Sequence, residues 1–461
     1  MRRLVSAPTT LVPLVSLTLA VACTAPRGAS TGASGPTSSA TTALSVDSAL
    51  VAIARTPLWP RFAPLTTPVA IFDGAHTYLF RHPSPPAGYA VVAGRADVVV
   101  RDGRDTAITA NTSAPLGGVV TATVMLDSRS QVRDAAALTI HELFHVYQRA
   151  RHPDWQANEA TLFTYPVEDS VALALRREET AGLHRALAGL ARDSVRCWAS
   201  VFTSARARRH VRLSDAAAEY ERGTELNEGL AQFVERRAAG RAVTVAESDV
   251  PAAEVRRRAY DIGAGIAELL SRLQPGWENA FDASGRGSGM SLEVALANAL
   301  LELRPRCPSP TAAERAAWTA QAGADVRAML AERERVRADY LARAGWRLVV
   351  DAGSAPFFPQ GFDPLNVARL SPTEILHSRF LKLQGSLGSV ELLSRASLTA
   401  GQPGAHPLFN GVVRLTVAGL PEAPAVRDSS GVLMFDAPGL RGRLRGVRAD
   451  TTGTVIHIGP R

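Results

Sequence analysis

Apolar and polar positions follow three successive patterns along the chain, and the first is a series of short apolar runs between residues 45 and about 130. Turn residues such as Asp73-Gly74 separate these runs, which is typical of strands. A short amphipathic helix near Ser45–Arg55 is expected to precede them. The predicted strands are Val69–Phe72, Thr77–Phe80, Ala90–Ala93, Asp97–Arg101 and Val119–Met125.

From residue 131 to about 345 the pattern changes to helical periodicity. The predicted helices are Gln131–Ala150, Asp169–Leu190, Ala191–Ala207, Ser214–Ala239 and Arg256–Leu273. The fourth helix is expected to be interrupted near Gly223 and to end at Gly240, which favours a left-handed C-terminal cap. Thr311-x-x-Glu314 has the form of a capping box and predicts a polar helix ending near Ala344-Gly345.

Residues 346–461 return to short apolar runs between Gly and Pro turns. They predict strands at Trp346–Val350, Val412–Val417, Val432–Phe435 and Thr454–Ile458, with weaker signals at Phe380–Leu383 and Val390–Leu393. The predicted fold class is therefore α+β, with a β-rich N-terminal part (45–130), a helical part (131–345) and a small C-terminal β domain (346–461).

The N-terminus has the pattern of an export signal. Met1-Arg2-Arg3 is a charged start, Leu11 to Ala22 is apolar, and Cys23 follows small residues. Residues 1–23 resemble a bacterial lipoprotein signal, which implies that Cys23 carries a lipid anchor. Ala20 departs from that pattern, so ordinary cleavage to a secreted or periplasmic protein stays open. Residues 24–44 are rich in small and polar residues and predict a flexible linker.

Charge adds little to this division. The 461 residues carry a formal charge of +8, and only one of the 51 basic residues, Lys382, is a lysine. The arginines are dispersed among acidic residues without a nucleic-acid-binding motif, so no nucleic-acid partner is expected. The densest clusters, Arg206–Arg209 and Arg256–Arg258, are interpreted as solvated helix faces. Membrane contact is expected only through an anchor at Cys23.

Two further cysteines, Cys197 and Cys307, remain in the chain after Cys23. In an oxidising compartment they can form one disulfide. Two separate buried thiols are the alternative, because neither cysteine lies near a motif that would decide between the two.

Candidate chemistry lies in the helix Gln131–Ala150, which contains the motif His141-Glu142-Leu143-Phe144-His145. Positions i and i+4 share one helix face, so both imidazoles can bind one Zn2+ ion. Glu142 can then act as the general base on a zinc-bound water. The alternative is two ordinary helical histidines with an unrelated glutamate between them.

A zinc site of this kind needs a third protein ligand. Candidates downstream are Glu159, Glu168, Asp169, Glu178, Glu179, Glu225 and Glu228. The stretch Leu226–Ala231 (Leu-Asn-Glu-Gly-Leu-Ala) resembles the gluzincin metallopeptidases, the group of thermolysin-like and aminopeptidase N-like enzymes. The resemblance implies His141, His145 and Glu228 as metal ligands and Glu142 as general base. The 83 positions between His145 and Glu228 are more than in the best-known members.

Tyr260 is similar in position to the tyrosine with which several gluzincins donate a hydrogen bond to the oxyanion. A half-buried helical tyrosine is the alternative, and His210 and Tyr220 are reserve candidates for this role. Glu225 and Glu235 are candidates for orienting a ligating imidazole.

The function predicted from these residues is zinc-dependent hydrolysis of a peptide or protein substrate outside the cytoplasm. Two alternatives stay open, a non-catalytic surface lipoprotein that binds through a zincin scaffold and a zinc hydrolase of a non-peptide bond. The strand Val119–Met125 leads into the motif helix, and its edge is a predicted place for a substrate backbone to pair.

Overall fold

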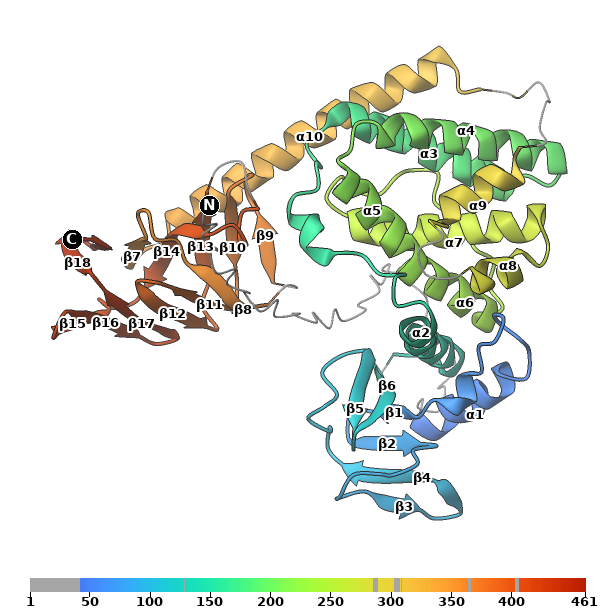
Figure 1. The fold of residues 1–461 in the computed structure, drawn as a ribbon, viewed down its shortest axis with the longest axis horizontal. Coiled ribbons are helices and arrows are strands. Elements are labelled where there is room, and N and C mark those ends of the chain that lie inside the picture. Colours follow the sequence, from blue (N-terminus) through green and yellow to red (C-terminus); the bar gives the residue numbers. More distant parts are fainter. Residues whose placement is uncertain are drawn as a thin grey trace, which may run out of the picture. The chain divides into compact units, whose positions relative to one another are not determined.

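The computed structural model describes residues 42–127, 129–284, 289–301, 307, 309–363, 366–402 and 406–461. The predicted α+β class is confirmed, with an N-terminal six-stranded sheet, a central helical region and two C-terminal sheets (Figure 1). The chain divides into two compact units, Met1–Val51 with Leu65–Leu143, and Ala52–Pro64 with Phe144–Arg461. The predicted signal with Cys23, and most of the predicted linker, lie outside the described residues.

The first unit is built on one mixed sheet. Helix α1 (Ala43–Ile53) precedes strands β1 (Val69–Phe72), β2 (His76–Phe80), β3 (Ala90–Val92), β4 (Arg95–Asp102), β5 (Thr112–Leu116) and β6 (Val119–Met125). The strand order is β3-β4-β2-β1-β6-β5, and β1 and β6 run parallel. All five predicted strands are present, and the bounds of β1 and β6 are as predicted.

Strand β5 was not predicted, and it changes the interpretation of β6. Gly117 and Gly118 both have positive φ, 53° and 81°, and form the two-residue turn that pairs β5 with β6. Strand β6 therefore lies between β1 and β5. The prediction that β6 offers a free edge for a substrate backbone was wrong, because β5 occupies that edge.

The central region contains helices α2 (Val132–Arg151), α3 (Ser170–Ala188), α4 (Arg192–His210), α5 (Asp215–Thr224), α6 (Leu230–Ala239), α7 (Val255–Leu273), α8 (Trp277–Ala283), α9 (Leu292–Ala299) and α10 (Ala312–Leu341). The predicted capping box of Thr311 and Glu314 is present at the start of α10, and Gly240 caps α6 with φ 63°. A 3-10 turn, η2 (Glu159–Phe163), follows α2.

The expected interruption near Gly223 lies two residues later, as the π-helical turn η3 (Glu225–Gly229) between α5 and α6. Its Leu230 N–H bonds to the carbonyl of Glu225, one residue further back than in an α-helix. A Cβ on Gly229 would lie 2.6 Å from the Cα of Gly263 in α7, so this turn and α7 cross with their backbones in contact. Gly223 itself lies within α5, where a Cβ would meet the backbone of Gln156 at 2.7 Å.

The C-terminal half of α2 is anchored by one buried carboxylate, Asp282 of α8. It accepts hydrogen bonds from Trp59 Nε1 at 3.0 Å and from the hydroxyl of Tyr147, and His152 Nε2 lies 3.0 Å away. Arg151 adds a contact at 3.3 Å. These bonds fix α2 against α8 and the segment around Trp59.

The C-terminal strands form two sheets that share one core (Figure 1). The strands are β7 (Trp346–Asp351), β8 (Phe358–Phe362), β9 (Val367–Arg369), β10 (Glu374–His377), β11 (Phe380–Gly385), β12 (Gly388–Leu393), β13 (Ser397–Gly401), β14 (Val412–Leu420), β15 (Ala425–Ser429), β16 (Val432–Ala437), β17 (Leu440–Arg445), β18 (Val447–Thr452) and β19 (Val455–Pro460). One sheet has the order β18-β19-β7-β14-β13-β10-β9 and the other β15-β16-β17-β12-β11-β8. Every strand predicted in this part is present.

Cys197 of α4 and Cys307 form a disulfide across 110 positions, which decides between the two alternatives that the sequence left open. A disulfide is typical of proteins that fold in an oxidising compartment outside the cytoplasm. Among the described residues, no helix combines the length and apolar character needed to cross a membrane.

Candidate metal centre

The three predicted metal ligands lie together in the structure. Helix α2 supplies His141 and His145, and the π turn η3 supplies Glu228. One potential ligand atom from each side chain lies within 4.8 Å of the other two, and all three residues are buried. Glu142 is on the same helix and is also buried. The group can hold a metal ion.

The donor set fits zinc. Two imidazole nitrogens and one carboxylate oxygen are the ligands of many catalytic zinc sites. His145 Nε2 lies 3.2 Å from Glu228 Oε2. Two ligands of a tetrahedral zinc ion, each at about 2.1 Å, are roughly 3.4 Å apart, so these two atoms can bind one ion without moving far.

Gln148 determines which nitrogen of His145 faces the metal position. Its Nε2 donates to the carbonyls of Leu226 and Asn227 at 2.9 and 3.0 Å, so its Oε1 is the end that faces the imidazole. The Nδ1–H of His145 donates to that oxygen at 2.8 Å, which leaves Nε2 with its lone pair towards Glu228. Gln148 thus joins α2 to the turn that contains Glu228.

Gln148 was not among the predicted orienting residues. The available signal was its spacing, since position i+3 from His145 lies on the same helix face. Glu225, which was predicted for this role, instead accepts two bonds of 2.7 Å from Arg206.

Arg256 of α7 holds the carboxylate of Glu228 from its other side. Its Nη2 donates to Glu228 Oε1 at 2.6 Å, and its Nη1 donates to Glu159 Oε1 at 2.7 Å. Burial disfavours the charge of Arg256, but Glu228, Tyr260 and Glu159 hold its pKa above the ordinary value. The pKa of the Glu159 carboxyl is raised by burial and by the proximity of Glu228, against the effect of Arg256. One guanidinium therefore joins two carboxylates at the edge of the centre.

Tyr260, one turn along α7 from Arg256, lies at the same guanidinium. Its hydroxyl accepts a hydrogen bond of 3.3 Å from Arg256 Nη2, the nitrogen that also binds Glu228. Of the reserve candidates, Tyr220 donates to Glu159 Oε2 at 3.3 Å, and burial is the main reason that its pKa is raised. His210 Nε2 lies 3.2 Å from Glu221 Oε2, within a different cluster.

The remaining candidate ligands make other contacts. Asp169 caps helix α3 by accepting from the N–H groups of Val171 and Ala172. Glu168 contacts Arg333 and Arg369, and Glu178 contacts Arg208 and Arg315. These contacts leave Glu228 as the acidic residue that the described structure places with both histidines.

The interpretation of the arginine clusters as solvated helix faces was wrong for most of their members. Arg206, Arg209 and Arg258 are buried and contact the buried carboxylates of Glu179, Glu221 and Glu225; we call these six residues the charge network. Glu179 alone contacts all three arginines, at 3.1, 2.7 and 3.0 Å. Burial opposes its charge, but these arginines lower its pKa to about 2. The network links α3, α4, α5, η3 and α7.

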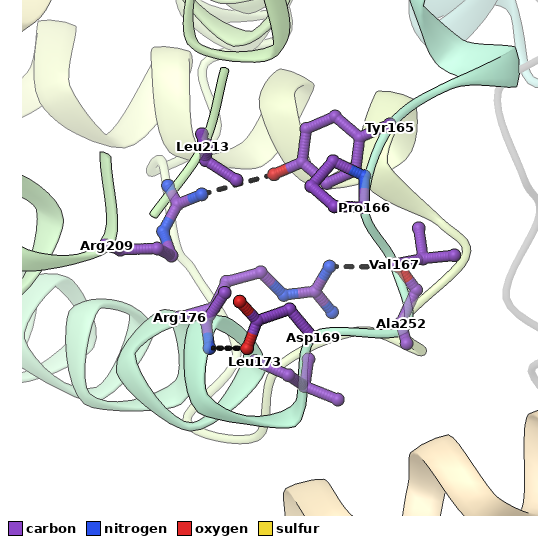
Figure 2. Close-up of a pocket in the computed structure, with 10 residues that line it drawn as sticks. Tyr165, Pro166, Val167, Asp169, Leu173, Arg176, Arg209, Leu213 and Ala252 are labelled. Atoms are coloured by element: carbon purple, nitrogen blue, oxygen red, sulfur yellow. Dashed lines mark hydrogen bonds between the residues drawn. The ribbon is translucent and has the colours of Figure 1, made fainter. Parts of the chain in front are cut away.

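A small cavity of about 20 Å³ lies beside the charge network and has room for one water molecule. Figure 2 shows Arg209 and the hydroxyl of Tyr165 facing each other along its wall, 3.3 Å apart, with Arg176 opposite. The arginines are bound to carboxylates or carbonyls, so this cavity is part of the packing around the charge network.

No protein-family model, curated protein or solved structure matches this chain. The interpretation of the metal centre therefore rests on its own residues and their geometry.

Proposed function

We propose that this protein is a zinc-dependent hydrolase of peptide bonds that acts outside the cytoplasm, with Glu142 as general base. The observation that carries the proposal is the buried group of His141, His145 and Glu228. Glu142 lies between the two histidines on the same helix, as the chemistry of such a site requires. The disulfide between Cys197 and Cys307 supports the location.

When bound, zinc supplies a Lewis acid that polarises the scissile carbonyl and lowers the pKa of water. The residues of the chain supply the proton transfers and the alignment. Glu142 accepts the proton of the attacking water and passes it to the leaving amine. Tyr260 donates its hydroxyl hydrogen to the developing oxyanion, and Arg256 holds that hydroxyl in place. Gln148 fixes the ring of His145.

Two variants test this assignment in separate measurements. Glu228→Ala removes a ligand and is expected to lower the zinc content of the purified protein, measured by atomic emission after dialysis. Glu142→Gln is expected to keep its zinc and to lose about 10²–10⁴-fold in the rate of cleavage of a mixed peptide library. The control for folding is the thermal unfolding temperature of both variants.

Three outcomes contradict the proposal. Full cleavage by Glu142→Gln excludes this residue as the base, and unchanged zinc content in Glu228→Ala excludes the third ligand. A wild-type protein that holds zinc but cleaves no peptide excludes peptide bonds as substrate and favours one of the two alternatives, a hydrolase of another bond or a binding module.

A further inference from the structure

One arginine has a special position beside the metal centre. Arg256 lies on α7, where the paired glycines Gly229 and Gly263 let the backbone of the π turn contact the helix. This close crossing brings the guanidinium of Arg256 to the carboxylate of Glu228. A planar guanidinium with two donor nitrogens can bind two carboxylates in fixed directions, which an ammonium group cannot do.

The contacts divide the two oxygens of Glu228 between two tasks. Oε1 accepts from Arg256 at 2.6 Å, with Asn227 Nδ2 at 3.4 Å, whereas Oε2 lies 3.2 Å from His145 Nε2. The carboxylate is thereby held with one oxygen towards the metal position and the other towards the protein. A quarter turn of the carboxylate about its last bond would break both the contact with Arg256 and the approach to His145.

A positive charge beside a metal ligand has a second effect, which opposes cation binding by simple electrostatic repulsion. Glu159 counters it, because its Oε1 accepts from the other nitrogen of the same guanidinium at 2.7 Å. With both carboxyl groups ionised, the formal charges of Arg256, Glu159 and Glu228 sum to one negative charge. The orienting effect of Arg256 is therefore retained while most of its repulsion is compensated.

We propose that Arg256 is a positioning residue for the metal ion, which holds Glu228 in the orientation that binds zinc and keeps Tyr260 beside it, with Glu159 as its counter-charge. The inference rests on the metal binding in the proposed function and not on the peptide bond as substrate. If Arg256 acts by orienting Glu228, its removal weakens zinc binding. If it acts only through its positive charge, its removal strengthens zinc binding, and this difference provides the test.

The experiment compares Arg256→Met, Arg256→Lys and the wild-type protein by the zinc dissociation constant, measured by competition with a chromophoric chelator without substrate. If Arg256 orients Glu228, both variants bind zinc about 10–100-fold more weakly, since methionine has no donor and lysine has one nitrogen in place of the two that bind the two carboxylates in fixed directions. Arg257→Met is the matched control, because Arg257 is the next residue, its side chain is exposed, and it forms an ion pair with Glu254 on the same side of the helix start. Its zinc affinity is expected to equal that of the wild type.

A second readout separates positioning from loss of structure. The visible absorption spectrum of the Co2+-substituted protein reports ligand geometry, and it is expected to change in Arg256→Lys while the thermal unfolding temperature of the metal-free protein stays near the wild-type value. Glu159→Gln removes the counter-charge and is expected to weaken zinc binding in the same measurement.

The outcomes that overturn the proposal are distinct. Tighter zinc binding by Arg256→Met, with no change in Arg256→Lys, would mean that Arg256 acts through charge alone. Equal affinities in all variants would mean that Arg256 has no part in the metal centre. A wild-type protein that binds zinc but cleaves no peptide refutes the proposed function and leaves these affinities valid, whereas one that binds no zinc refutes both.

Discussion

Two glutamates of one π turn, Glu225 and Glu228, have opposite surroundings. Glu225 accepts from one guanidinium nitrogen of Arg206 with both oxygens at 2.7 Å, and the side chain of Arg206 is fully buried. Glu228 gives one oxygen to Arg256, whose side chain is 20% exposed, and presents the other to His145. The two carboxylates are three positions apart, and the turn directs one to the charge network and the other to the metal centre.

Charge balance distinguishes the charge network from the candidate metal centre. The charge network has three glutamates for three arginines, so its buried charges compensate one another. The group at the candidate metal centre has two carboxylates, Glu159 and Glu228, which share the single guanidinium of Arg256. Its excess negative charge favours a cation, and Glu228 Oε2 lies 3.2 Å from His145 Nε2.

The largest expected effect is the loss of stability of the charge network in acid. Arginine contacts lower the pKa of Glu179 to about 2 against the effect of burial, compared with an ordinary value of 4.5, and they hold the pKa of Glu221 well below its ordinary value. As the pH falls below about 4.5 the unfolded chain takes up protons before the folded one, so stability is lost progressively towards pH 2. Glu225 has the opposite sign, since burial raises its pKa, and it reduces this slope.

The measurement is urea unfolding between pH 5 and pH 2 with a chelator present, so that metal release does not contribute. The wild-type free energy of unfolding is expected to fall steeply, and that of Glu179→Gln to fall less, from a lower starting value. A variant with the same pH dependence as the wild type would show that Glu179 is not responsible for the acid sensitivity.

The elements with strong local patterns could be predicted, and missed strands such as β17 depend on contacts with a neighbouring strand. Strand β17 (Leu-Arg-Gly-Arg-Leu-Arg) has glycine where its inward face would show an apolar residue. The ring of Phe435 covers Gly442, where a Cβ would lie 1.9 Å from the ring, so the neighbouring strand supplies the missing apolar surface. The alternation of apolar and polar residues within β17 does not reveal this contact with Phe435.

The three residues of the candidate metal centre could be predicted because the motif fixes His141 and His145 on one helix face and the stretch around Glu228 resembles a metal-binding helix of the gluzincins. Their supporting residues could not. Arg256 was interpreted as solvated because local composition does not show that α7 crosses the π turn at Gly263. Likewise, Arg209 is buried against Glu179, which lies 30 positions earlier on another helix. The sequence around Arg209 does not show this contact.

A smaller effect is expected from substitution of Gln148, which tests the candidate metal centre through its zinc affinity. Gln148→Met removes both the acceptor for His145 and the donors to the carbonyls of Leu226 and Asn227. Zinc affinity is expected to fall about 10–100-fold, as measured by chelator competition. Gln148→Glu keeps an acceptor for the imidazole and is expected to retain more of the affinity. If Gln148→Met binds zinc as tightly as the wild type, the ring of His145 is oriented by another group.

The smallest expected effects come from substitutions of two tyrosines in one apolar cluster. One tyrosine contacts the charge network and the other contacts the group at the candidate metal centre. Tyr165 and Tyr220 pack together with Ala217 and Val255, and their hydroxyls point to different carboxylates. Tyr165 donates to Glu221 in the charge network and also accepts from Arg209. Tyr220 donates at 3.3 Å to Glu159, which lies beside the candidate metal centre.

Substitution by phenylalanine removes only the hydroxyl and keeps the ring in the cluster. Tyr165→Phe leaves a buried charged acceptor with one bond fewer, so a loss of about 1.5–3 kcal/mol in the free energy of unfolding is expected. Tyr220→Phe removes a long bond to a carboxylate that Arg256 still holds, and a loss of about 1 kcal/mol or less is expected, with zinc affinity nearly unchanged. Urea unfolding of the two variants measures the difference. Equal losses would mean that a hydroxyl beside the metal centre matters as much to stability as one within the charge network, and the division between the two glutamates of the π turn would then not extend to their neighbours.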